Sequence, residues 1–124
     1  ACAEIDQEQS TGAARLAALI AQYQSALDGG QSLCLCVSFS TSTGSLSAET
    51  ISEMNLFRSM IIDWLAKTFA QGRGDGTIQN VVDPLAEAAA TLPLLEGAQL
   101  AARVAQDTQR FKVAVQLLSI RLSA

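Results

Sequence analysis

The sequence has no histidine and only three cysteines, and these shortages exclude several kinds of site. Without histidine there is no Ser-His-Asp triad, no general base that titrates near neutral pH, and no ligand set for most zinc sites. Cys2, Cys34 and Cys36 are an odd number, so they cannot form a closed disulfide framework. Their odd number and mostly apolar surroundings indicate free thiols, which are typical of a reducing compartment. We therefore expect a cytoplasmic protein.

Charged residues are also scarce, at 16% against 49% apolar residues, and the 124 residues are enough to bury the core of one domain spanning 1–124. Eight basic residues are outnumbered by twelve acidic ones, giving a net charge of −4. Since DNA binding depends on Lys and Arg neutralising phosphates, we do not expect this segment to bind DNA by itself. No apolar run reaches the roughly 18 residues that a membrane span needs, and no signal-peptide pattern opens the chain.

Patterns that would indicate catalysis are missing as well. There is no nucleophile–base pair, no phosphate-binding loop and no metal-ligand spacing. Gly72, Gly74 and Gly76 lack the preceding strand and the spacing of a dinucleotide-binding loop. We therefore expect no catalytic residue, no metal, no cofactor and no enzyme activity.

Apolar residues at three- and four-residue spacing predict four longer helices. We expect the four helices to begin at Ser10 or Thr11, at Ser47, at Asp83-Pro84, and at Asp107 or Thr108. The first three should end at Gly29-Gly30, at Gly72 and at about Ala105. The apolar run 33–39 reads as a short buried helix, because a lone strand would have no backbone partner. The predicted fold is an all-α bundle of about five helices.

The last two predicted helices have more apolar surface than one core requires. In the helix that begins at Asp83, the polar residues lie on one side before Pro93 and on nearly the opposite side after it, as Glu96, Gln99 and Arg103. The final helix carries two apolar stripes, one of Phe111, Ala114, Val115, Leu118 and Leu122, the other of Val113, Leu117 and Ile120. A helix deep in the domain would also show two stripes, but a second subunit is the favoured use of the spare face.

The order of several short motifs resembles the C-terminal domain of TetR/AcrR-family regulators over about residues 10–124. These motifs are the Gly-Gly pair followed by Leu33–Phe39, Trp64-Leu65-Ala66 ahead of the three glycines, Asp83-Pro84, Leu95-Glu96-Gly97-Ala98, and Arg110-Phe111. The resemblance implies the regulatory half of a repressor, whose DNA contacts belong to a helix-turn-helix domain absent from this chain.

The resemblance also implies a homodimer in which the last two long helices of each copy form a four-helix bundle across a two-fold axis. Gly97 would let two backbones approach closely, and Gln99 and Arg103 could pair across the axis. The apolar seam would consist of Phe111, Val115, Leu118 and Leu122.

A small, mostly apolar effector would bind among the sensing helices of such a domain. By position, the residues that could line its pocket are Tyr23, Phe39, Phe57, Ile61, Trp64 and Leu92, although ordinary core packing is an alternative for each. Two further functions stay open: a purely structural dimerisation domain without a ligand, and a redox sensor that uses Cys34 and Cys36. Those two cysteines point to different sides of a helix or strand, so a disulfide between them is disfavoured.

Overall fold

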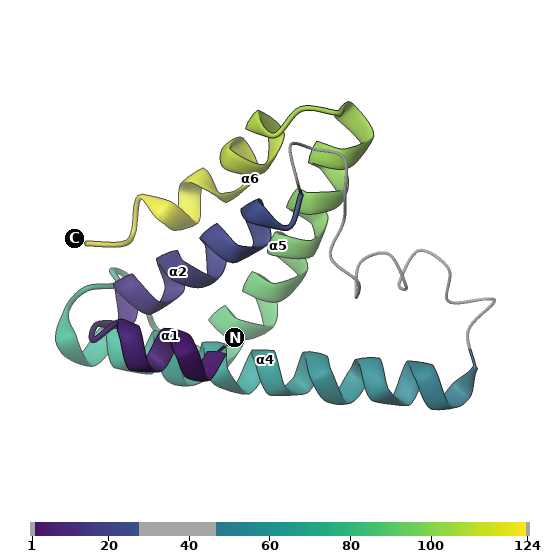
Figure 1. The fold of residues 1–124 in the computed structure, drawn as a ribbon. Coiled ribbons are helices and arrows are strands. Elements are labelled where there is room, and N and C mark those ends of the chain that lie inside the picture. Colours follow the sequence, from purple (N-terminus) through teal and green to yellow (C-terminus); the bar gives the residue numbers. More distant parts are fainter. Residues whose placement is uncertain (1, 28–46, 124) are drawn as a thin grey trace.

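A computed structural model describes residues 2–27 and 47–123 of the chain. Within these residues the backbone forms five α-helices (Figure 1). They are α1 (Cys2–Glu8), α2 (Gly12–Ser25), α4 (Ala48–Asp75), α5 (Pro84–Ala105) and α6 (Gln109–Ser119). The all-α fold is therefore confirmed, while the predicted short helix at 33–39 lies outside the described residues.

The helices begin where the capping residues of the sequence place them. The side chains of Thr11, Ser47 and Asp83 accept hydrogen bonds from backbone N–H groups in the first turns of α2, α4 and α5. Such caps satisfy donors that have no partner inside the helix. At the start of α6, Asp107 Oδ1 accepts from the N–H of Gln109 at 3.0 Å. The predicted helix starts are confirmed.

Two predicted helix ends were wrong. Helix α4 does not stop at Gly72 but runs to Asp75, and it ends at Gly76, which has a φ of 77° that favours glycine. Gly72 is buried inside the helix, where its missing side chain matters for packing. Helix α2 ends at Ser25, whereas the Gly-Gly pair predicted to end it lies outside the described residues.

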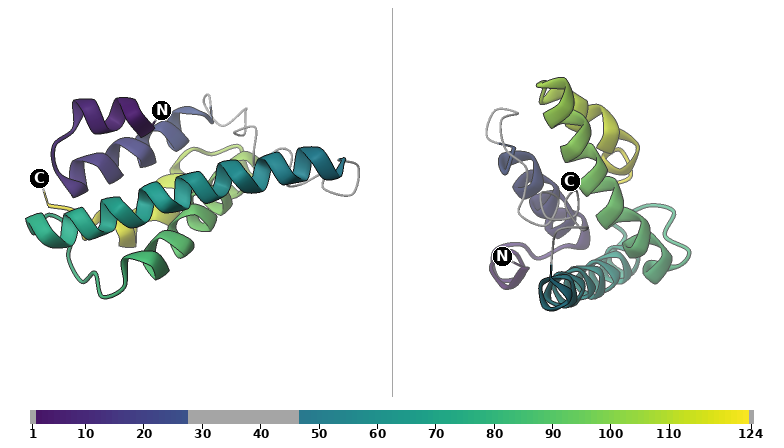
Figure 2. Two further views of the ribbon diagram at one scale, coloured as in Figure 1. Left: turned by 90° about the horizontal axis from the view of Figure 1, so that it is seen from below. Right: turned by 90° about the vertical axis from the view of Figure 1, so that its right-hand side faces the viewer.

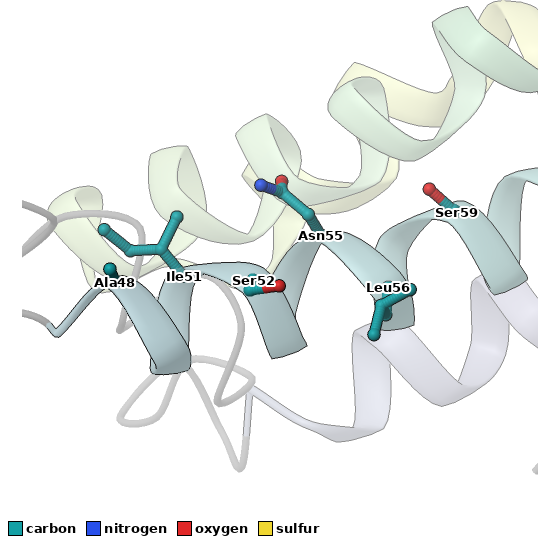
Figure 3. A pocket seen from close by; sticks show the side chains of 6 residues that line it. All are labelled: Ala48, Ile51, Ser52, Asn55, Leu56 and Ser59. Carbon is teal, nitrogen blue, oxygen red and sulfur yellow. The ribbon is translucent and has the colours of Figure 1, made fainter.

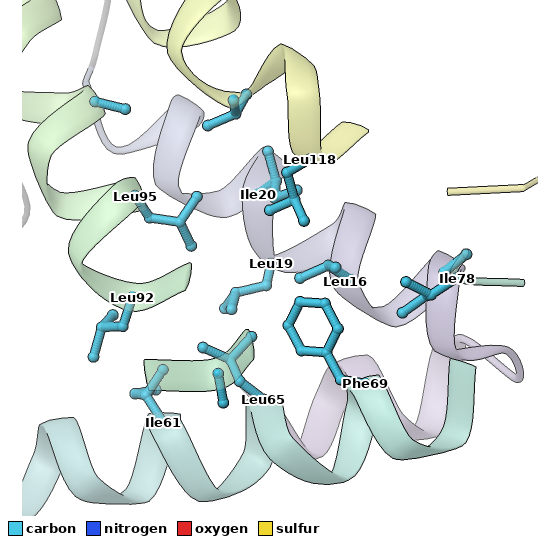
Figure 4. Packing of buried hydrophobic residues seen from close by; sticks show 14 of the residues in the cluster. Leu16, Leu19, Ile20, Ile61, Leu65, Phe69, Ile78, Leu92, Leu95 and Leu118 are labelled. Carbon is cyan, nitrogen blue, oxygen red and sulfur yellow. The ribbon is translucent and has the colours of Figure 1, made fainter. Parts of the chain in front are cut away.

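The long helix α4 forms one edge of the bundle, and its N-terminal half projects beyond the other helices (Figure 1). Helix α2 packs against α4 and α5, and α5 packs against α4 and α6. Figure 2 shows α5 and α6 next to each other on the side of the bundle away from α1. The core fills the space between α2, α4 and α5, with buried residues that include Leu16, Leu19, Leu65, Phe69, Leu92 and Leu95 (Figure 4).

The C-terminal segment turns back onto the bundle after α6 ends. Leu122 forms an isolated antiparallel bridge with Ile78 in the segment between α4 and α5. The Arg121 guanidinium binds both carboxylate oxygens of Glu87 on α5, at 2.8 and 3.0 Å. Because such two-point pairing is geometrically specific, it holds the segment after α6 against α5. Helix α6 ends at Ser119, so Leu122, predicted on a stripe of the final helix, lies beyond it.

Candidate sensing site and dimer surface

Helix α5 keeps its polar side chains inside the bundle after Pro93. Glu96 forms an ion pair with Arg58 of α4, and Gln99 is fully buried, with Nε2 donating to the backbone oxygen of Tyr23 at 2.8 Å. The predicted change of buried face at Pro93 was therefore wrong. One face of α5 is buried along its length, and these bonds within the chain compensate Glu96 and the amide nitrogen of Gln99.

The opposite side of α5 is exposed and apolar. It carries Ala86, Ala90, Pro93, Gly97, Leu100, Ala101 and Val104. A side chain added at Gly97 would meet no atom within 4 Å, so the surface there is open. Val104 is 76% exposed even though it is large and apolar. Helix α5 is therefore apolar on its exposed side as well as on most of its buried side.

The two predicted apolar stripes of the final helix, α6, lie on different sides: one faces the core and the other is exposed. The first stripe lies in the core of the chain, with Phe111, Val115 and Leu118 buried and Leu122 half-buried beside it. The second stripe is exposed, and Leu117 reaches 77% exposure. The predicted dimer seam of Phe111, Val115 and Leu118 is thus contradicted, because these side chains already fill the core of their own chain.

Of the other predicted interface residues, Gln99 is also excluded, because its side chain is buried and bonded to α2. Arg103 is half-buried, and Gly97 lies on the exposed side of α5. We use the term outer face for the exposed apolar residues of α5 and α6, which lie on adjacent helices. The outer face consists of Pro93, Gly97, Leu100, Val104, Val113, Leu117 and Ile120.

The structure brings together only some of the predicted effector residues. Ile61 and Leu92 are buried, and their side chains point toward each other between α4 and α5 (Figure 4). Tyr23 is half-buried and is joined to α5 through its backbone bond to Gln99. These three residues border the interior shared by α2, α4 and α5.

The remaining predicted effector residues lie elsewhere. Trp64 faces α1, where its Nε1 donates to Asp6 Oδ1 at 3.0 Å. Phe57 is 45% exposed on the projecting half of α4. Phe39 lies outside the described residues. The structure does not bring Trp64 and Phe57 together with Ile61 and Leu92, because helical spacing does not tell which neighbouring helix a face will meet.

Residues that the structure describes line several hollows on the surface. One of about 360 Å³ lies on the N-terminal half of α4 (Figure 3), and its lining is Ala48, Ile51, Ser52, Asn55, Leu56 and Ser59. Two others, of about 470 and 400 Å³, follow the groove between α2 and the α6 end of the chain and share Ile20, Gln24 and Ser119. None of the three is lined by a predicted effector residue, so they are separate from the interior between α2, α4 and α5.

Sequence reasoning missed the inward role of Gln99. Its side-chain oxygen Oε1 is buried and has no hydrogen-bond partner. A signal was present, because Gln99 follows Leu92 and Leu95 by seven and four residues and therefore shares their helix face. A lone amide on an otherwise apolar helix face needs a partner inside the chain or in a bound molecule.

Only one cysteine lies among the described residues. Cys2 is half-buried and unpaired, and burial raises the pKa of its thiol. A raised pKa lowers the fraction of reactive thiolate at neutral pH. Burial thus disfavours the reactive thiolate form of Cys2, while Cys34 and Cys36 lie outside the described residues.

The chain is similar in fold to two solved regulators. A TetR-family transcriptional regulator from Agrobacterium tumefaciens superposes with a TM-score of 0.88 over 99% of this chain, at 22% sequence identity. Escherichia coli NemR in its reduced form superposes with a TM-score of 0.79 over 97% of this chain, also at 22% identity. The chain spans 65% and 62% of the lengths of those two proteins, respectively.

No protein-family model and no curated protein match the sequence. None of the described helices is both long enough and apolar enough to cross a membrane. The described helices form an all-helical bundle, in which Gln99 of α5 bonds to the Tyr23 backbone inside and the outer face is apolar. This bundle has the TetR-type regulator fold, as the resemblance in the sequence predicted.

Proposed function

We propose that residues 1–124 form a single domain that dimerises and senses a small molecule as part of a TetR-type transcriptional regulator. The observation that carries the proposal is the exposed apolar outer face on α5 and α6 in a chain with this fold. DNA would be read by a helix-turn-helix domain outside these residues. The net charge of −4 agrees with that division, since phosphate contacts need basic residues.

The dimer would form through the outer face. A two-fold interface is self-complementary, so the same patch on each copy suffices. Pro93 and Gly97 leave little side-chain volume on α5, which allows the helices of two copies to approach closely. Leu117 and Val104 then supply apolar area that is costly to leave in water. The four helices would pack as a bundle.

This dimer is tested by placing charges on the outer face. The double variant Val104→Asp with Leu117→Asp should remain folded and sediment as a monomer near 13.0 kDa, while the unaltered chain sediments at twice that mass. A matched control is Leu56→Asp with Met60→Asp, which charges two exposed apolar residues of α4. The control should remain a dimer. An unaltered chain that sediments as a monomer would refute the interface.

The effector in this proposal is a small, mostly apolar molecule bound between α2, α4 and α5. Support comes from Ile61 and Leu92, which are apolar and face each other there. A ligand that binds only the folded state must raise the melting temperature. A panel of apolar compounds should therefore contain some that raise it in differential scanning fluorimetry. The close burial of Ile61 and Leu92 also suits a purely structural dimerisation domain, for which no compound would give a shift.

A further inference from the structure

The buried amide of Gln99 has one satisfied end and one unsatisfied end. Its nitrogen Nε2 donates to the Tyr23 backbone oxygen at 2.8 Å, and its oxygen Oε1 has no hydrogen-bond partner. The residue is 0% exposed, so bulk water does not reach this oxygen. Most buried polar atoms in folded proteins are paired, and an exception calls for a specific explanation.

The amide cannot be turned around to remove the problem. The Tyr23 carbonyl lies in the last turn of α2. The N–H of Leu27, four residues further on, does not bond to it but to the backbone oxygen of Gln24 at 3.2 Å. A carbonyl oxygen only accepts hydrogen bonds, so Gln99 must present its nitrogen to Tyr23. Its oxygen is thereby directed elsewhere, and it needs a donor that the described residues do not supply.

The helix face that carries this oxygen is largely apolar. Gln99 shares the inward face of α5 with Leu92 and Leu95, which are buried and apolar. Ligand sites are typically apolar walls with a few polar groups that orient the ligand. A single fixed acceptor in such a wall selects molecules that carry a hydrogen-bond donor.

We propose that Gln99 Oε1 accepts a hydrogen bond from an N–H or O–H group of a mostly apolar effector bound between α2, α4 and α5. The inference rests on the proposed sensing function and adds the polar group that the effector must carry. Helix α5 carries Gln99 on its inward side and residues of the outer face on its other side. The helix that contacts the effector would therefore also contact the second copy. A buried water is the competing partner for this oxygen.

The test uses two matched pairs of probes, 1-naphthol with 1-methoxynaphthalene and indole with 1-methylindole. Within each pair, only one member can donate a hydrogen bond. The donor should bind the unaltered chain at least about fivefold more tightly in isothermal titration calorimetry, the ratio expected for one hydrogen bond. Gln99→Met keeps the length and removes the acceptor, and it should bring the ratio close to one. Gln22→Met, an exposed glutamine on α2, should leave the ratio unchanged.

Each outcome decides the proposal. If both members of each pair bind the unaltered chain equally, or if Gln99→Met keeps the preference, the oxygen has a water partner and the proposal is wrong, although effector binding itself stands. If no probe of either pair binds, the proposal fails, while the panel of apolar compounds still decides the sensing function and the sedimentation test decides the dimer. The ratio in the unaltered chain does not depend on how well Gln99→Met folds, and circular dichroism checks that variant.

Discussion

The carboxylate of Asp75 connects three parts of the backbone through its hydrogen bonds. Oδ2 accepts from the N–H of Gly12 at 2.9 Å, and Oδ1 accepts from the N–H and the hydroxyl of Thr77. The Thr77 hydroxyl and then the Gly12 N–H hold the pKa of Asp75 below its ordinary value. The charged carboxylate thus ties the start of α2 to the end of α4.

This pKa shift predicts how acid affects stability. A carboxyl group whose pKa is lower in the folded state stabilises the fold above its unfolded pKa, about 3.9 for Asp, and the contribution is lost as pH falls through the folded pKa. Asp75→Asn should therefore reduce the loss of unfolding free energy between pH 6 and pH 3, as measured by urea unfolding. In the control Asp63→Asn, on an exposed side of α4, the unfolding free energy should fall between pH 6 and pH 3 as much as in the unaltered chain. If Asp75→Asn lost as much unfolding free energy over this pH range as the unaltered chain, the stabilising role of the Asp75 carboxylate would be contradicted.

At the scale of the helices, α2 and α4 cross with their backbones in direct contact. A Cβ at Gly12 would lie 2.3 Å from the Gly72 nitrogen and 2.9 Å from the Thr68 oxygen. Backbone atoms cannot move aside as a flexible side chain can, so the crossing requires glycine at position 12. Inside α4, a Cβ at Gly72 would lie 2.3 Å from Ile78 Cγ1, so the packing of Ile78 explains a buried glycine where helix propensity disfavours it.

Substitution at the crossing should therefore be costly. Gly12→Ala should lower the unfolding free energy by about 2 kcal/mol or more, the range for forced overpacking. The matched change Gly74→Ala, in α4 with nothing within 4 Å, should raise it by about 0.5–1 kcal/mol because alanine loses less entropy in a helix. Urea unfolding measures both. Similar midpoints for Gly12→Ala and the unaltered chain would show that the helices can separate at this point.

At the scale of the whole molecule, the two stripes of α6 have different partners. Val115→Asp with Leu118→Asp places two charges in the core, and we expect the helical circular dichroism signal to be lost. Val113→Asp with Leu117→Asp places the same charges on the outer face, and we expect a folded monomer by sedimentation. The reverse result, a folded monomer from the first pair, would return the dimer seam to the position that the sequence suggested.

Local features of the chain were sufficient to predict the helices. Thr11, Ser47 and Asp83 cap them because each side chain bonds to backbone only two or three residues away. The fold family was likewise within reach, since motif order survives in the sequence. The two apolar stripes of α6 were also visible as a periodic pattern.

Only the tertiary structure decided which stripe faces the core and where Gln99, Trp64 and Gly72 lie. Each of these depends on a contact across the sequence: Gln99 with Tyr23, Trp64 with Asp6, and Gly72 with Gly12. A helix with two apolar faces can bury either one, and periodicity is the same for both. The choice follows from how the helices fill one shared interior, and that interior exists only once α2, α4, α5 and α6 have packed together.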